Sequence, residues 1–109
     1  MQRMTRPRGF AAGTVDTAEV ILKDMPNGQS FAELRILMEP RQRTSGKPYQ
    51  QEVIVRLFGD GMDKAKTLCL GQRIGVYGDF DTEQTHAVSG KVYANLVILA
   101  RDFEELEVE

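Results

Sequence analysis

Residues 49–59 read YQQEVIVRLFG, and the other segments of the chain are expected to pair around this stretch. Its side chains alternate with a period of two and include several β-branched types, which predicts a β-strand. One face is mostly apolar and suits a core. That face carries Tyr49, Gln51, Val53, Val55 and Leu57. The opposite face is mixed, because it places the cation of Arg56 beside the ring of Phe58.

The segments before this strand also predict strands. Residues 10–23 are strand-like but interrupted, since Gly13 and the polar Asp16 and Thr17 indicate a bulge or bend. Met-Pro-Asn-Gly at 25–28 is a strong turn signal. Residues 30–39 alternate again, and 42–47 form a polar loop of the hairpin type. The expected core residues of the second strand are Ala32, Leu34, Ile36 and Met38.

A short helix and two further strands are predicted in the second half of the chain. Within the helical segment 60–71, Cys69 falls at helical spacing from other apolar residues, so we predict a small core residue rather than a reactive thiol. Residues 73–81 and 91–100 predict strands, and 83–90 predict a polar hairpin loop between them. The inward side chains of the first of these strands are expected to be Ile74, Val76 and Phe80.

The order of these elements decides the fold class. Three strands, one helix and two strands match the layout of the OB-fold, an all-β, five-stranded Greek-key barrel with one short helix between strands three and four. A β-sandwich would need about seven strands. We therefore predict a single OB-fold domain over residues 9–107, preceded by a disordered basic arm at residues 1–8.

Composition limits the possible functions. The 109 residues carry a net charge of −2 with 41% hydrophobic content, and no apolar run approaches the ~20 residues of a membrane span. The N-terminal residues lack the apolar core of a signal peptide, so we expect a cytoplasmic protein without a membrane partner. One cysteine and one histidine predict no metal site and no cofactor. Asp79 and Asp81 lack a neighbouring base, so we do not expect an enzyme.

Charge is unevenly distributed along this weakly acidic chain. Residues 41–47 hold three cations and no acid, while residues 102–109 hold five acids. Such asymmetry can produce a local basic surface on an acidic protein. The alternative is a loop and a tail whose charges are simply solvated.

Several segments resemble the bacterial single-stranded DNA-binding protein family. The likeness covers roughly residues 9–106 and rests on MPNG at 25–28, FAELRIL at 31–37, VIVRLFG at 53–59, LGQRIGVYGDF at 70–80 and KVYANLVIL at 91–99. The chain is also similar to primosomal replication protein N, a shorter OB-fold relative that works in replication restart. The resemblance implies sequence-tolerant binding of single-stranded DNA in replication, repair or recombination. It also implies a homo-oligomer, as a dimer or tetramer, and replication or repair proteins as further partners.

The binding surface departs from the family pattern in its aromatic residues. The family places tryptophans there, and this chain has none; Gln42 or a neighbour, Glu52 and Thr85 align with those positions. Phe58 matches a phenylalanine that the family uses for stacking. Because each stacked base contributes ~1–3 kcal/mol, the loss of two or three rings is expected to weaken binding by several kcal/mol.

The candidate nucleic-acid-binding residues combine rings with cations. We expect phosphate contacts from the loop cations Arg41, Arg43 and Lys47 and from Arg35 and Arg56. Phe58 is expected to stack bases, together with Tyr49 or Tyr77. His86 and Lys91 belong to the second hairpin and are weaker candidates.

Each candidate also has a structural interpretation. In this interpretation Phe58 packs under the helix and Arg56 is an ordinary surface cation, while Tyr49 anchors the core and Tyr77 is an oligomer contact. Tyr93 is expected to pack in the core, and Phe31 to pack beside a turn. A rival function follows from this interpretation, namely an OB-fold protein-interaction or primosome-type module with weak or no DNA binding. Its mixed face would be buried against a protein partner or a second copy through Leu37, Ile54, Phe58 and Tyr77.

Overall fold

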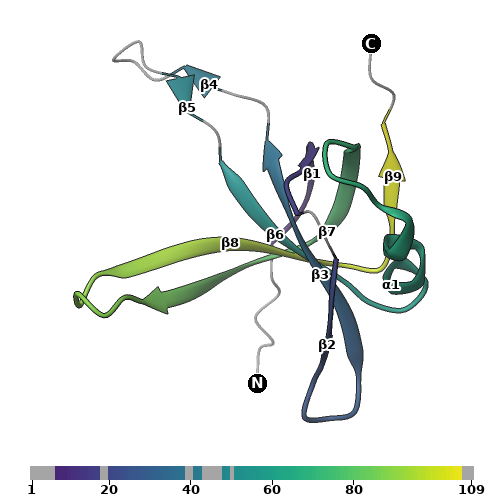
Figure 1. Cartoon of the computed structure of the whole chain (residues 1–109), viewed down its shortest axis with the longest axis horizontal. Coiled ribbons are helices and arrows are strands. Elements are labelled where there is room, and N and C mark those ends of the chain that lie inside the picture. The colour runs from purple at the N-terminus through teal and green to yellow at the C-terminus, as the bar shows by residue number, and fades with distance from the viewer. Residues whose placement is uncertain (1–6, 18–19, 39–40, 43–47, 50, 107–109) are drawn as a thin grey trace.

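The structure is a computed structural model that describes residues 7–17, 20–38, 41–42, 48–49 and 51–106 (Figure 1). Its strands are β1 (Arg8–Val15), β2 (Ile21–Asp24), β3 (Ser30–Met38), β4 (Arg41–Gln42), β5 (Pro48–Tyr49), β6 (Glu52–Leu57), β7 (Arg73–His86), β8 (Val92–Ala100) and β9 (Phe103–Glu105). A helix, α1 (Asp60–Lys64), continues into a 3₁₀ turn, η1 (Ala65–Thr67), between β6 and β7.

Five of these strands close into a barrel. Neighbouring strands follow the order β1-β3-β6-β8-β7, and β1 also pairs with β7, which completes the ring. The pairing of β6 with β8 is parallel, whereas the other pairings within the ring are antiparallel. The predicted all-β OB-fold, with one short helix between its third and fourth barrel strands, is confirmed.

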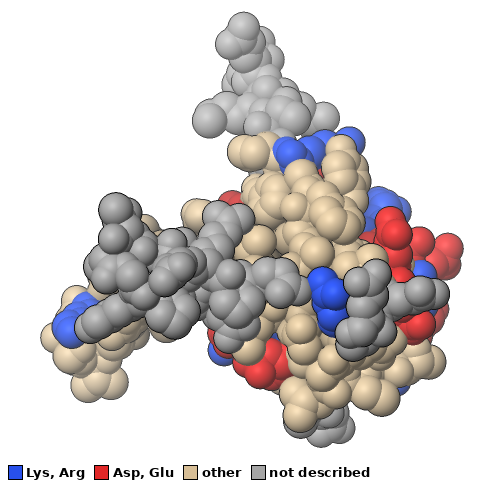
Figure 2. Space-filling model, turned by 90° about the horizontal axis from the view of Figure 1, so that it is seen from above, with Lys and Arg blue, Asp and Glu red and all other residues tan. Residues whose placement is uncertain are grey.

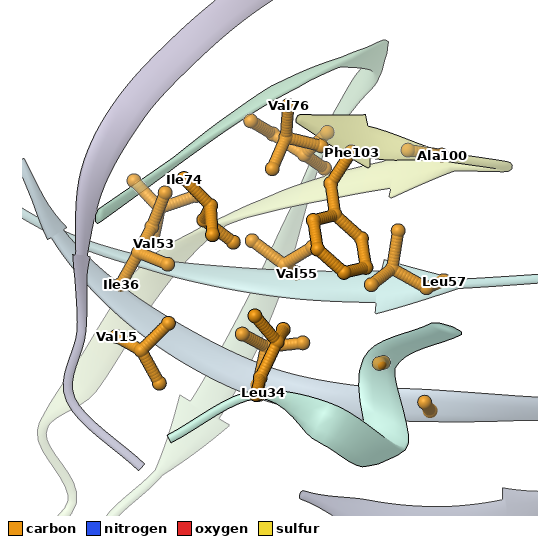
Figure 3. Close-up of a cluster of buried hydrophobic side chains, with 14 of the residues drawn as sticks. Val15, Leu34, Ile36, Val53, Val55, Leu57, Ile74, Val76, Ala100 and Phe103 are labelled. Atoms are coloured by element: carbon orange, nitrogen blue, oxygen red, sulfur yellow. The ribbon is translucent and has the colours of Figure 1, made fainter. Parts of the chain in front are cut away.

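The barrel core is formed by the alternating apolar positions of these strands (Figure 3). Val53, Val55 and Leu57 of β6 are fully buried, as predicted for one face of that strand. The predicted core face of β3 is likewise confirmed, since Ala32, Leu34 and Ile36 are also buried. The core is completed by residues from other elements, including Val15, Ile74, Val76, Ile98, Ala100 and Phe103.

The first strand is interrupted, as predicted, between Val15 and Ile21. A Cβ at Gly13 would lie 2.5 Å from the carbonyl oxygen of Leu37, so only glycine allows β1 to approach β3 this closely. The strand begins at Arg8, two residues earlier than predicted, and Arg8 is therefore part of the barrel rather than of an arm. Residues 1–6 of the predicted arm lie outside the described residues.

The prediction that Cys69 lies in the core is wrong. The helix ends at Thr67 with the 3₁₀ turn, and Leu68 adopts an extended conformation with φ −73° and ψ 141°. Helical spacing therefore does not continue to residue 69. Leu68 occupies the buried position, while Cys69 is exposed with its thiol free.

The predicted loop at residues 83–90 is also wrong in part. β7 continues as a strand to His86, which pairs with Val92, and the connection is a tight turn closed by hydrogen bonds between Ala87 and Lys91 and between Gly90 and Ala87. The outer halves of β7 and β8 therefore form a two-stranded ribbon that projects from the barrel (Figure 1). Polar residues on this ribbon pair across strands without covering a core, which explains why their sequence resembles a loop.

Candidate nucleic-acid interface

The outward side chains of β3 and β6 form the surface on which three of the predicted contacts lie, Arg35, Arg56 and Phe58. We call this surface the β3–β6 face, and it comprises Phe31, Glu33, Arg35, Leu37, Glu52, Ile54, Arg56 and Phe58. The antiparallel register places Glu33 opposite Arg56 and Leu37 opposite Glu52. Side chains directly opposite each other on one face of a sheet are close enough to interact. The two strands therefore bring acids and cations together on this face.

A pair of rings lies at one end of the β3–β6 face. The ring centroids of Phe31 and Phe58 are 5.4 Å apart with an interplanar angle of 42°, and Arg56 Cζ lies 5.6 Å from the centroid of Phe31. Phe31 is buried and Phe58 is half-buried, so Phe31 supports a ring that is still partly accessible. The backbone N–H of Phe58 donates to the carbonyl of Ala100 at 2.9 Å, which fixes this residue after the end of β6. A ring held in this way is suited to stacking.

A chain of ion pairs crosses the same face. Lys23 Nζ lies 2.7 Å from Glu33 Oε2, and Arg56 Nε lies 2.9 Å from Glu33 Oε1. Arg56 Nη2 also donates to Glu83 Oε2 of β7. Burial alone would raise the pKa of Glu33, but the hydrogen bonds from Lys23 and Arg56 outweigh it and hold the pKa below its ordinary value. Burial likewise opposes the charge of Arg56, and its two carboxylate partners raise its pKa.

The second predicted arginine is paired as well. Arg35 Nη1 lies 2.9 Å from Glu52 Oε1, and both side chains are largely exposed. On and around this face, three cations are paired with three carboxylates. The cations are Lys23, Arg35 and Arg56, and the carboxylates are Glu33, Glu52 and Glu83. Figure 2 shows Lys and Arg in separate small groups on the side that it presents, with no continuous basic band among the described residues. A phosphate that binds these arginines must therefore compete with carboxylates that already neutralise them.

The cation-rich loop is only partly described. Arg41 and Tyr49 pair through their backbones in the short β4–β5 hairpin, and Gln42 pairs with Pro48. This hairpin projects from the barrel on the same side of Figure 1 as the β7–β8 ribbon. Arg43 and Lys47 lie outside the described residues. The roles of these four candidates stay predictions.

Tyr77 lies apart from the β3–β6 face. It is 60% exposed on β7, and β8 separates its strand from β6. Its cross-strand neighbour is Phe10 of β1, which is 54% exposed. Two shallow pockets adjoin Tyr77, and Arg101 lines both of them. The structure therefore groups Tyr77 with Phe10 and Arg101, not with Phe58.

His86 and Lys91 are exposed at the far end of the β7–β8 ribbon. Tyr93, which pairs with Thr85, is 52% exposed, so its predicted place in the core is wrong. The reason is that this part of the ribbon extends beyond the barrel and has no core to cover. Tyr93 is thus an accessible ring that the sequence did not indicate.

Several other surface features were not predicted from the sequence. Phe10 and Arg101 are exposed, and the described residues show no ion pair for Arg101. Period-two alternation in residues 8–15 would have placed Phe10 outward, opposite the buried Ala11. The link between Arg56 and Glu83 had no sequence signal, because it depends on the register of strands that are far apart along the chain.

Together, the closed ring and its outward face of rings and paired charges define an OB-fold barrel protein. No protein-family model matches the sequence, and a search of curated proteins finds no match. The described residues contain no helix that is both long and apolar enough to cross a membrane.

Solved structures with this fold include three single-stranded DNA-binding proteins. The small one from Streptomyces coelicolor superimposes with a TM-score of 0.73 and 17% identity, over 94% of this chain and 95% of that one. A deletion mutant of the Thermus aquaticus single-stranded DNA-binding protein superimposes with a TM-score of 0.62 and 24% identity, over 92% of this chain and 50% of that one. The Plasmodium falciparum protein, in complex with single-stranded DNA, superimposes with a TM-score of 0.64 and 19% identity, over 98% of this chain and 100% of that one. At these identities the likeness establishes the shared barrel fold.

Proposed function

We propose that this protein binds single-stranded DNA with little sequence preference, in DNA replication, repair or recombination in the cytoplasm. The main support is the half-buried ring of Phe58, which Phe31 holds at the barrel surface beside the guanidinium of Arg56. The structural neighbours add support, since all three are named as single-stranded DNA-binding proteins and one is a complex with single-stranded DNA. The proposed activity is binding, without catalysis.

In this proposal, rings and cations contribute separately. A base stacks on Phe58, and Tyr49 provides a second ring; each stacked base contributes ~1–3 kcal/mol. Stacking is indifferent to sequence because every base has a π-face. Phosphates are held by Arg35 and Arg56 on the β3–β6 face. Further phosphate contacts come from the hairpin cations Arg41, Arg43 and Lys47, and from His86 and Lys91 on the ribbon.

The ion pairs determine how strong this binding can be. Arg35 and Arg56 already donate to carboxylates, so a phosphate gains only the difference between two similar charge-assisted hydrogen bonds. We expect modest affinity that falls as salt rises, because bound counterions are released from the DNA.

An anisotropy titration with a fluorescently labelled oligonucleotide tests this function. A single strand of ~30 nucleotides, long enough to span an OB-fold site, should bind saturably at low salt and be released at high salt. A duplex of the same sequence should bind much more weakly, because its bases are not free to stack. Micromolar protein that leaves the single strand unbound at low salt would refute the proposal.

The exposed pair of Phe10 and Tyr77 favours a second function, self-association. Two large exposed side chains side by side on β1 and β7 form an apolar patch, flanked by the charged residues Arg8, Asp79 and Arg101. We infer that a second copy of this chain covers the patch in a dimer or tetramer. Sedimentation equilibrium should show that Tyr77→Lys shifts the protein towards monomer. Leu70→Lys, at a residue that is equally exposed elsewhere, should not. A wild-type protein that is monomeric at all concentrations would exclude this function.

A further inference from the structure

Glu83 is the outermost member of the ion-pair chain and comes from a different part of the fold than the arginine it holds. It lies on β7 at the base of the ribbon, in register with Asn95 of β8. Its carboxylate accepts a hydrogen bond from Nη2 of Arg56, which is 27 residues earlier in the chain and two strands away. The side chain therefore reaches across β8 to the β3–β6 face.

The two carboxylates on Arg56 are not equivalent. Glu33 is 14% exposed and is held twice, by Lys23 Nζ at 2.7 Å and by Arg56 Nε at 2.9 Å. Glu83 is 47% exposed and, among the described residues, forms an ion pair with Arg56. A partly buried carboxylate held by two cations is costly to displace, whereas an exposed one held by a single cation exchanges readily with solvent. Glu33 therefore fixes the guanidinium in place through Nε, and Glu83 engages Nη2.

We propose that Glu83 competes with DNA phosphates for Arg56 and so limits the affinity of the β3–β6 face for single strands. This inference rests on the proposed function. A guanidinium donates to carboxylate and phosphate oxygens in the same geometry, so the two acceptors occupy the same donors. Because the chain holds Glu83 next to Arg56, its effective concentration is on the order of millimolar. A phosphate that binds Arg56 through Nη2 must displace it.

The position of Arg56 makes this competition relevant to stacking. Its Cζ lies 5.6 Å from the Phe31 ring, and Phe31 packs on Phe58. A phosphate that replaced Glu83 would bind the guanidinium that faces Phe31, the ring that supports the proposed stacking ring of Phe58. Release of Glu83 and stacking on Phe58 would then occur in one binding event.

Replacing Glu83 tests the inference as a gain of binding, which unfolding cannot imitate. Glu83→Gln keeps the size of the side chain but removes the competing charge. We expect the Kd for a labelled single-stranded oligonucleotide to fall by roughly 3- to 10-fold. The slope of log K against log salt should also steepen by about 0.7, the value for one more phosphate contact on a single strand.

Two further variants separate competition from a general change in net charge. Glu105→Gln on β9 removes the same charge from an exposed residue for which the described residues show no ion pair. It should leave the slope unchanged and alter the Kd much less than Glu83→Gln. Adding Arg56→Gln to Glu83→Gln should abolish the gain, because the cation that the phosphate would use is missing.

The outcomes distinguish this inference from the proposed function. If the wild type binds and Glu83→Gln behaves like Glu105→Gln, the competition is refuted while single-strand binding stands. If the gain persists without Arg56, the competition is also refuted. If neither the wild type nor Glu83→Gln binds single strands at low salt, the proposed function fails, and the inference fails with it.

Discussion

Replacing Phe58 with leucine removes the ring that the proposed function requires while keeping an apolar side chain. Phe58 packs on Phe31 with centroids 5.4 Å apart. Loss of this ring pair should lower the free energy of unfolding by about 0.5–1.5 kcal/mol. Loss of one stacked base should weaken binding by ~1–3 kcal/mol, which is roughly 5- to 150-fold in Kd. Urea unfolding measures the first effect, and anisotropy with a labelled oligonucleotide measures the second.

The control for this variant is Phe103→Leu. Phe103 is buried in the barrel core, so the same chemical change there should cost stability without weakening binding. If Phe58→Leu is destabilised as expected but binds with the wild-type Kd, Phe58 only packs beneath the helix. The stacking mechanism would then be wrong at its main residue.

Three further predictions concern stability and accessibility. The pKa of Glu33 is lowered in the fold, so the stability that its ion pairs contribute is fully present above its ordinary pKa of 4.5 and is lost as pH falls through the lowered folded pKa. Glu33→Gln should therefore make the free energy of unfolding less dependent on pH in that window. Parallel curves of stability against pH for the two proteins would contradict the ion pairs. Leu34→Ala should lower the free energy of unfolding by about 2–5 kcal/mol, whereas the exposed control Leu70→Ala should change it by less than about 0.5 kcal/mol. Equal effects of the two variants in urea unfolding would contradict the burial of Leu34 in the core. Cys69 should react fully with a thiol reagent in the native protein, and a thiol that reacts only after denaturation would place it in the core after all.

The fold was predictable because its signals are local. Alternation correctly identified the buried faces of β3 and β6, although Gln51, which was expected on the same face as Val53, is exposed and precedes β6. The order of elements identified the barrel. The wrong predictions concern residues whose local pattern is helical or strand-like but which lie beyond the end of the helix or of the core. Cys69 has helical spacing, but the helix ends before it. Tyr93 has a strand pattern, but its strand extends past the core.

The candidate site was less predictable, because its electrostatics depend on register. From the sequence, Arg35 and Arg56 are two cations on one face of a strand pair. In the structure, Glu52 and Glu83 neutralise them, and neither partner is evident without knowing which strands are adjacent. Tyr77 was grouped with Phe58 because both point outward. β8 lies between their strands, and only the topology separates them.

Amide chemical-shift mapping with a short single-stranded oligonucleotide at low salt tests the central claim most directly, because it reports both binding and its location. The account predicts that the largest shifts fall on the β3–β6 face, around Arg56 and Phe58. Absence of any shift would contradict it, as would shifts confined to Phe10 and Tyr77, which lie where β1 pairs with β7.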